Sequence, residues 1–132
     1  SCFVETHSHM VKTHTVTRCL CDPSMNRVPL ALEVNDQKRW ASEGDIARRM
    51  DFALRTAWHN GTRAVRTHLD GVTGPNEQSL RARVYSAFSA ARATWQQKGL
   101  VLQGVANLWL PLYAHPEVAD AHAKHAAQHE GV

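Results

Sequence analysis

Residues 2–9 have the sequence CFVETHSH, with apolar side chains at the start and two histidines at the end. This pattern is typical of a buried β-strand that ends in polar side chains. Side chains two positions apart in a strand point the same way, so Glu5, His7 and His9 share one face. Two imidazoles placed in this way can bind one divalent metal ion. The alternative is a pair of polar histidines at a strand end, because His-x-His alone is weak evidence.

The remainder of the chain alternates between helical and strand patterns. Ser42 and Asp45 form a helix-capping signal, and Asn60-Gly61 ends the helix that follows. Pro116 is well placed in the first turn of a last helix. The predicted strands lie near residues 2–9, 62–69 and 100–110, and the predicted helices near residues 43–60, 77–98 and 116–130.

This β-α-β-α-β-α order predicts an α/β fold with parallel strands and right-handed crossovers. Three βα units are less than half of an eight-stranded barrel, which takes about 250 residues. We therefore expect residues 1–132 to form one incomplete domain with two exposed sheet edges. Because such edges pair with other chains, we expect a homo-oligomer or a longer parent protein.

The composition excludes several classes of partner. The chain is 43% hydrophobic and 20% charged, as in a soluble globular protein, and no apolar run reaches the about 20 residues of a membrane helix. Lys and Arg are interleaved with Asp and Glu at a net charge of +3, which argues against nucleic-acid binding.

Three cysteines without paired spacing indicate reduced thiols and a cytoplasmic protein. Cys19 and Cys21 with His14 could form a soft-metal site, but loop thiols without a function are the simpler interpretation.

A second strand carries another row of ionisable side chains. Arg66, His68 and Asp70 alternate along it and lie toward its carboxyl end. In parallel α/β folds ligands bind at that end. A one-sided ionisable cluster there favours a site over a core. The alternative is an Arg66–Asp70 ion pair with His68 standing behind a ligand, which would itself be functional.

Three segments together resemble a known family. Phe3–Met10 with Lys12–Thr15 resembles the first barrel strand of the cytosine deaminase-like branch of the amidohydrolase superfamily. Gly61–Asp70 resembles the second strand of that branch, and Leu102–Ala106 resembles the third. The three occur in the same order at compatible spacing. The resemblance implies the first three βα units of a TIM-type (β/α)8 barrel.

The resemblance also implies an activity. Such enzymes hydrolyse non-peptide C–N bonds in cytosine-like, triazine-like or amidine substrates. A Zn or Fe ion held by His7 and His9 would lower the pKa of water to about 7. Glu5, Arg66, His68, Asp70 and Trp109 would lie around the ion or the small N-heterocyclic substrate.

In that family the remaining ligands and the acid/base groups belong to later strands, so we expect the isolated chain to be inactive. The alternative is a truncated or degenerate relative without catalysis, which self-associates through exposed strands and binds metal weakly.

Two positions depart from the family pattern. Met10-Val11 stands where the family has an apolar residue followed by Asp, which leaves the anchoring of this loop open. Trp109 stands where many members have a substrate-reading glutamine, which argues against cytosine itself.

Two further sets of side chains are assigned structural roles. Trp58 and Trp95 are expected to pack the helices onto the sheet. The i, i+3, i+7 spacing of His122, His125 and His129 predicts one helix face, which we expect to be solvated rather than a metal or partner site.

Overall fold

The computed structural model describes residues 2–15, 42–70 and 78–132. One parallel sheet contains three strands in the order β1-β2-β3. The strands are β1 (Phe3–Ser8), β2 (Thr62–Leu69) and β3 (Val101–Ala106), and the α-helices are α2 (Glu43–His59), α3 (Gln78–Gln96) and α4 (Pro116–Ala126). Short 3-10 helices follow β1 and β3, namely η1 (Met10–Lys12) and η2 (Leu110–Ala114). The predicted α/β fold with alternating strands and helices is confirmed.

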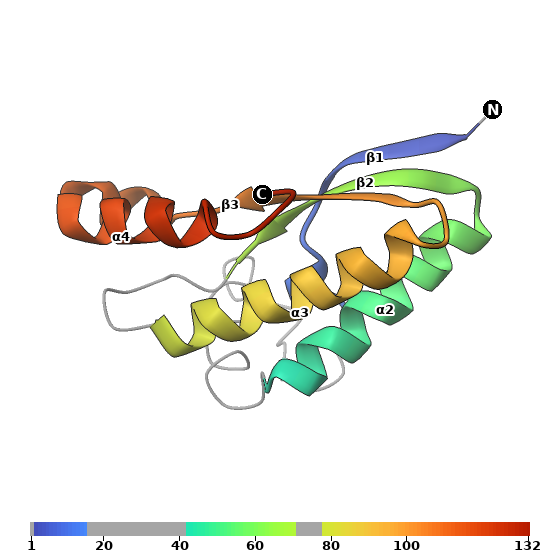
Figure 1. Ribbon diagram of the computed structural model, residues 1–132, viewed down its shortest axis with the longest axis horizontal. Helices are drawn as coiled ribbons and strands as arrows, with labels where there is room; N and C mark the ends of the chain where they lie inside the picture. Colours follow the sequence, from blue (N-terminus) through green and yellow to red (C-terminus); the bar gives the residue numbers. More distant parts are fainter. Residues whose placement is uncertain (1, 16–41, 71–77) are drawn as a thin grey trace, which may run out of the picture.

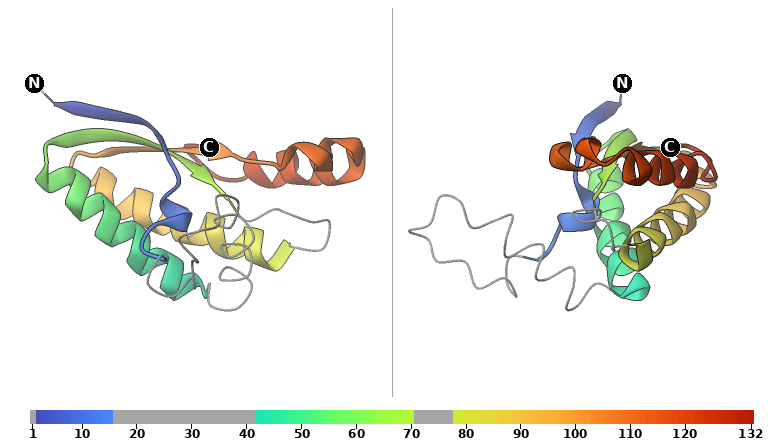
Figure 2. Two further views of the ribbon diagram at one scale, coloured as in Figure 1. Left: turned by 180° about the vertical axis from the view of Figure 1, so that it is seen from behind. Right: turned by 90° about the vertical axis from the view of Figure 1, so that its left-hand side faces the viewer.

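The sheet is covered on one face. Helices α2 and α3 lie side by side beneath the strands, whereas α4 lies beyond the end of β3 (Figures 1 and 2). The alternation along β2 follows from this arrangement. Val65, Thr67 and Leu69 point toward the helices and are buried, while Arg66 and His68 lie on the opposite face and are more exposed.

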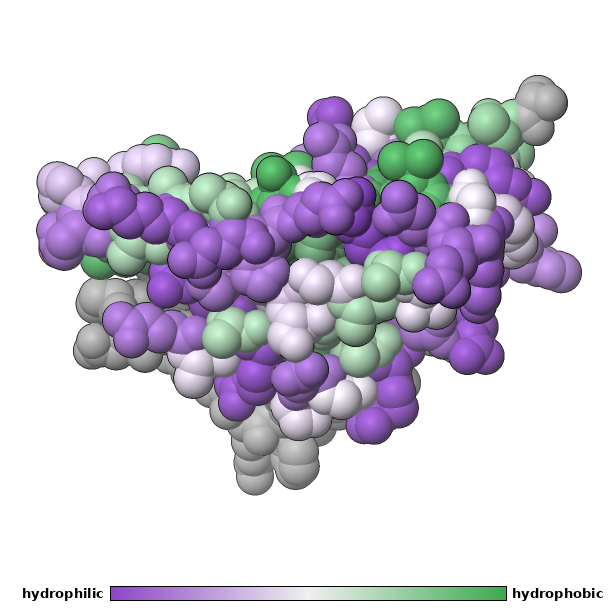
Figure 3. Space-filling model, viewed as in Figure 1, coloured by the Kyte–Doolittle hydropathy of each residue, from purple (hydrophilic) through white to green (hydrophobic). Residues whose placement is uncertain are grey.

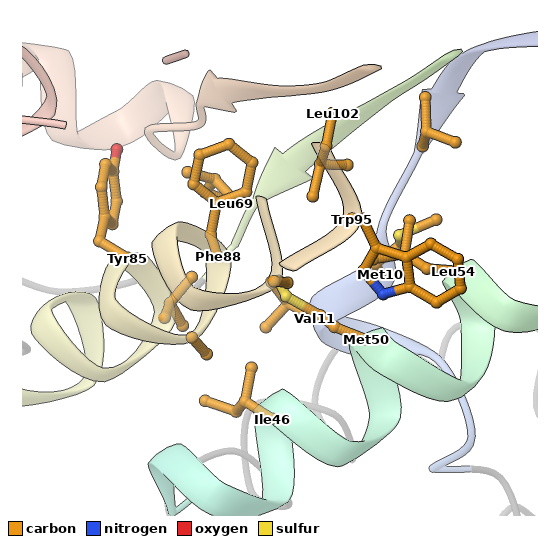
Figure 4. Packing of buried hydrophobic residues seen from close by; sticks show 14 of the residues in the cluster. Met10, Val11, Ile46, Met50, Leu54, Leu69, Tyr85, Phe88, Trp95 and Leu102 are labelled. Atoms are coloured by element: carbon orange, nitrogen blue, oxygen red, sulfur yellow. The ribbon is translucent and has the colours of Figure 1, made fainter. Parts of the chain in front are cut away.

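The core forms between the covered face and the two helices. Helix α2 contributes Ile46 and Leu54, and α3 contributes Phe88 and Trp95, all of them almost fully buried (Figure 4). The indole nitrogen of Trp95 donates a hydrogen bond to the Asp51 carboxylate at 3.1 Å, which satisfies its polar atom. Trp95 therefore packs as predicted, with the ring of Trp58 6.3 Å away.

The helix ends follow local chemistry. The Ser42 hydroxyl accepts the Asp45 backbone N–H at 3.1 Å, and Gly61, just past the helix, has a φ of +90°. The start and end predicted for this helix are confirmed. The third strand is shorter than predicted, because it ends at Ala106 and Pro111, which has no N–H for a sheet ladder, lies in η2.

The last helix is also shorter than predicted and ends at Ala126. The following turns bring Gly131 back to the sheet, where its carbonyl accepts the backbone N–H of Gly104 at 2.7 Å. The return of the chain to β3 explains why the helix does not continue to residue 130.

Apolar side chains remain exposed at the edge of the sheet. Phe3 and Val4 on β1 are 70% and 61% exposed, and Val101 on β3 is 64% exposed. Figure 3 shows hydrophobic side chains gathered over the β1 end of the molecule, whereas the surface over α4 is mostly hydrophilic. Within the described residues, no helix combines the length and the apolar character that crossing a membrane requires.

Candidate metal centre

Three histidines meet where β1 and β2 end. His7 lies on β1, His9 directly follows it, and His68 lies on the neighbouring β2. One ring nitrogen of each lies within 4.8 Å of the others. The Nε2 atoms of His7 and His9 are 3.1 Å apart, and the His68 ring centroid lies 4.4 Å from that of His7 and 4.7 Å from that of His9. The structure thus brings His68 beside the two predicted ligands.

A buried carboxylate stands behind His9. His9 Nδ1 and Asp70 Oδ2 are 2.7 Å apart, and Asp70 is 5% exposed. A carboxylate accepts this bond, so the proton lies on Nδ1 and the lone pair of Nε2 is free to face His7 and His68. The other carboxylate oxygen accepts the Asn107 amide at 2.6 Å and lies 3.4 Å from Lys12 Nζ. Asp70 therefore fixes both the tautomer and the orientation of His9.

This donor set fits a divalent ion. Two nitrogens bound to tetrahedral zinc at 2.0–2.1 Å lie about 3.3 Å apart. The separation of 3.1 Å between the His7 and His9 nitrogens is close to that value. A carboxylate that accepts the outer N–H of a ligating histidine is the usual support of such a ligand. Three nitrogens also leave one of four tetrahedral positions for water or substrate.

The electrostatics of His68 agree with this fit. Burial, followed by the neighbouring imidazoles of His9 and His7, lowers the pKa of His68 below its usual value. Asp70 acts in the opposite direction and Lys12 lowers the pKa slightly further. His68 is therefore neutral at neutral pH, which is the form that binds a metal.

The turn after β1 is anchored from below the sheet. The Thr67 hydroxyl accepts the Met10 backbone N–H at 3.0 Å. The Arg49 guanidinium of α2 donates to the carbonyls of Val11 and of Thr13, the latter at 3.1 Å. Val11 itself is fully buried in the core. These bonds supply the loop anchoring that the absence of a carboxylate at position 11 had left open.

Sequence reasoning missed Lys12 and Asn107 as neighbours of the site. Asn107 was predictable in principle, because Leu69 pairs with Ala106 and the next residues, Asp70 and Asn107, therefore lie side by side. Lys12 lies in the 3-10 turn η1, where no periodic pattern indicates its direction.

The other predicted site residues lie apart from the ion-binding atoms. The Glu5 carboxylate accepts the His7 backbone N–H at 2.9 Å. Arg66 donates to Gln103 at 2.9 Å, so the alternative Arg66–Asp70 ion pair is wrong within the described residues. Trp109 caps η2, is 50% exposed and makes no ring contact with the three histidines among the described residues.

Two minor predictions have different outcomes. Cys19 and Cys21 lie outside the described residues, while the His14 ring packs edge-on against Phe52 at 4.7 Å. The solvated helix face predicted for α4 is wrong at His122, which is 4% exposed. His122 is buried beside Tyr85 of α3, whereas His125 and His129 are half-buried against the same ring.

Comparison with known proteins gives one informative relative. Over 105 residues the chain is 33% identical to a pterin deaminase of Rhizobium rhizogenes (strain K84 / ATCC BAA-868). The match covers 79% of this chain, which spans only 22% of the length of that relative. No family model matches the chain, and no solved structure matches it. The chain is therefore similar to one part of a deaminase.

Proposed function

We propose that this chain is the metal-binding part of a metal-dependent deaminase of the amidohydrolase type. The observation that carries the proposal is the convergence of His7, His9 and His68 at the ends of β1 and β2, with Asp70 behind His9. The 33% sequence identity to a pterin deaminase also supports a deaminase function.

The residues of this chain have separate roles in the proposal. His7, His9 and His68 hold a Zn or Fe ion through ring nitrogens. When bound, the ion supplies the Lewis acidity that makes water a nucleophile at neutral pH. Asp70 keeps the His9 lone pair directed at the ion, and the Asn107 amide and the Lys12 ammonium hold Asp70 in turn.

The proposed substrate is an aminated N-heterocycle, either pterin-like or cytosine-like, that loses its amino group as ammonia. The similar deaminase and the family resemblance both favour this class. Because the chain spans 22% of that relative, we propose that the proton-transfer groups come from outside these 132 residues and that the isolated chain does not turn over.

The test is metal binding by the purified chain. It is measured by isothermal titration calorimetry with Zn²⁺ and by the absorption spectrum with Co²⁺. We expect one strong site that H7A removes and H59A retains, because His59 is an exposed histidine at the end of α2. Equal zinc affinity in both variants would overturn the proposal. Ammonia release from pterin by the zinc-loaded chain would overturn the claim that the isolated chain is inactive.

The exposed edge of the sheet favours a second candidate, a non-catalytic module that self-associates. Phe3 and Val4 on the edge strand β1 are 70% and 61% exposed. Sedimentation would then show dimers or larger species that V4K converts to monomers, since a lysine on an edge strand opposes strand pairing. A monomeric wild-type chain that binds zinc tightly would exclude this candidate.

A further inference from the structure

A second group of titratable side chains lies between α3 and α4, apart from the metal centre. We call it the α3–α4 cluster: Arg81 and Tyr85 of α3, His122 and His125 of α4, and His129 beyond its end. The Tyr85 ring centroid lies 4.8 Å from that of His125, 4.9 Å from that of His129 and 6.2 Å from that of His122. Figure 4 shows the Tyr85 ring at the end of the core with its hydroxyl directed away from α2.

Several polar atoms of this cluster are buried without partners, whereas His129 Nδ1 lies 3.1 Å from the Ser89 hydroxyl. Tyr85 is fully buried and its hydroxyl has no hydrogen bond, and the same holds for both ring nitrogens of His122, which is 4% exposed. His125 Nε2 and Arg81 Nε are likewise buried and unpartnered. Buried polar groups in folded proteins nearly always have a partner, so these groups on facing elements have unused hydrogen-bonding capacity.

The charge of the cluster indicates the polarity of that ligand. Arg81 is a permanent cation close enough to Tyr85, His122 and His125 to affect the ionisation of each. Across the described ranges, no carboxylate forms an ion pair with Arg81. The acidic side chains in and just after α4 pair elsewhere, namely Glu117 with His115, Asp120 with Lys124 and Glu130 with Arg92. A guanidinium, a hydroxyl and imidazole N–H groups are all hydrogen-bond donors.

We propose that the α3–α4 cluster binds an oxyanion, a phosphate or carboxylate group held by Arg81, Tyr85 and His122. The anion balances the charge of Arg81 and accepts hydrogen bonds that are otherwise unmade. A metal ion is the weaker fit. Among the described residues, the only cluster of histidine, cysteine or carboxylate side chains with three ligand atoms within 4.8 Å of one another is the one at the strand ends. In addition, the positive charge of Arg81 repels a cation.

Anion binding at this place is coupled to protons. Burial and the charge of Arg81 lower the pKa of both His122 and His125, and each imidazole is further affected by a neighbouring one, His125 and His129 respectively. A bound anion favours the protonated imidazoles, so its affinity rises as the pH falls through this range.

The test uses the 132-residue chain, inorganic phosphate and NMR of the histidine ring nitrogens, with chloride at matched ionic strength as reference. We expect saturable chemical-shift changes at the ring nitrogens of His122 and His125, and a higher affinity for phosphate at lower pH. R81Q should weaken binding by about tenfold or more, as for a lost charged hydrogen bond. R83Q, the same charge change on the same helix, should not.

Y85F provides a second variant in case R81Q does not fold, since it keeps the packing ring and removes one donor. A titration with acetate distinguishes a phosphate site from a carboxylate site, because the anion that binds with the higher affinity identifies the type of oxyanion. The proposal is overturned by the absence of saturable shifts with both anions, by equal shifts with chloride, by equal affinity in R81Q and R83Q, or by zinc rather than anions shifting these rings.

Discussion

The two histidine clusters of this chain differ in the charged group that stands beside the imidazoles. At the strand ends, the Asp70 carboxylate accepts the outer N–H of His9 and directs a lone pair toward its neighbours. Between α3 and α4, the Arg81 guanidinium is close enough to His122 and His125 to lower the pKa of both, and no described carboxylate forms an ion pair with it. In the two proposals the same type of side chain therefore has two roles, as a metal ligand at the strand ends and as a hydrogen-bond donor between α3 and α4.

The largest expected effect separates the clusters by their affinity for zinc. H9A removes a ligand atom and should lower the zinc affinity of the chain by more than about hundredfold. Loss of a side chain that only hydrogen-bonds to a ligand typically lowers metal affinity by about tenfold to hundredfold. H125A should leave the affinity unchanged. Titration of both variants with Zn²⁺ measures the difference, and similar losses in the two would break the comparison.

The next effect concerns the carboxylate behind His9. D70N keeps the shape of the side chain but removes the charge that holds the His9 tautomer, so zinc affinity should fall by about tenfold to hundredfold. D120N is the matched control, because Asp120 pairs with Lys124 on the exposed surface of α4. An unchanged zinc affinity in D70N would show that Asp70 does not orient the ligand.

A smaller effect is expected in the pH dependence of stability. Burial lowers the pKa of His122 below its usual value of 6.5, so the unfolded chain binds more protons than the folded one just below that pH. The contribution of His122 to the free energy of unfolding should therefore be constant above about pH 6.5 and fall as the pH drops toward the lower folded pKa.

Urea unfolding at several pH values measures this dependence, with phosphate absent. H122F should remove part of the slope, whereas H59A should not, since His59 is exposed. A slope that persists unchanged in H122F would assign the acid sensitivity to other groups.

The smallest effect is expected at Tyr85. Without an anion its buried hydroxyl has no partner, so Y85F should change the free energy of unfolding by less than about 1 kcal/mol or raise it. Burial also raises the pKa of this hydroxyl to about 12. In the wild type, stability should fall between about pH 10 and pH 12, where only the unfolded tyrosine ionises. Urea unfolding of Y85F between about pH 10 and pH 12 should show a smaller fall in stability than the wild type. A large loss of stability in Y85F at neutral pH would contradict the absence of a partner for the hydroxyl.

Much of the candidate metal centre was predictable because strand geometry is regular. Alternation placed His7 with His9 and His68 with Asp70, and parallel strands bring their carboxyl ends together. Lys12 was not predictable, since its direction depends on a 3-10 turn fixed by Arg49 from a distant helix.

The α4 face illustrates a different limit of sequence reasoning. Helical spacing correctly placed His122 and His125 on one face, but spacing does not say what a face packs against. Their burial depends on Tyr85, about 40 residues earlier in the chain. The third strand was predicted too long because the apolar run continues past Ala106, although Pro111 lacks the N–H that a sheet ladder uses.

The Arg49 contacts make helix α2 a natural reporter for the strand ends. This guanidinium holds the carbonyls on both sides of Lys12, so the order of the turn after β1 and the order of the helix are linked. In the proposed metal site, an ion bound by His7 and His9 would restrict that turn, and the Arg49 hydrogen bonds would pass the restriction to α2. We expect amide hydrogen exchange around Arg49 to slow on metal loading, although the helix contributes no atom to the ion.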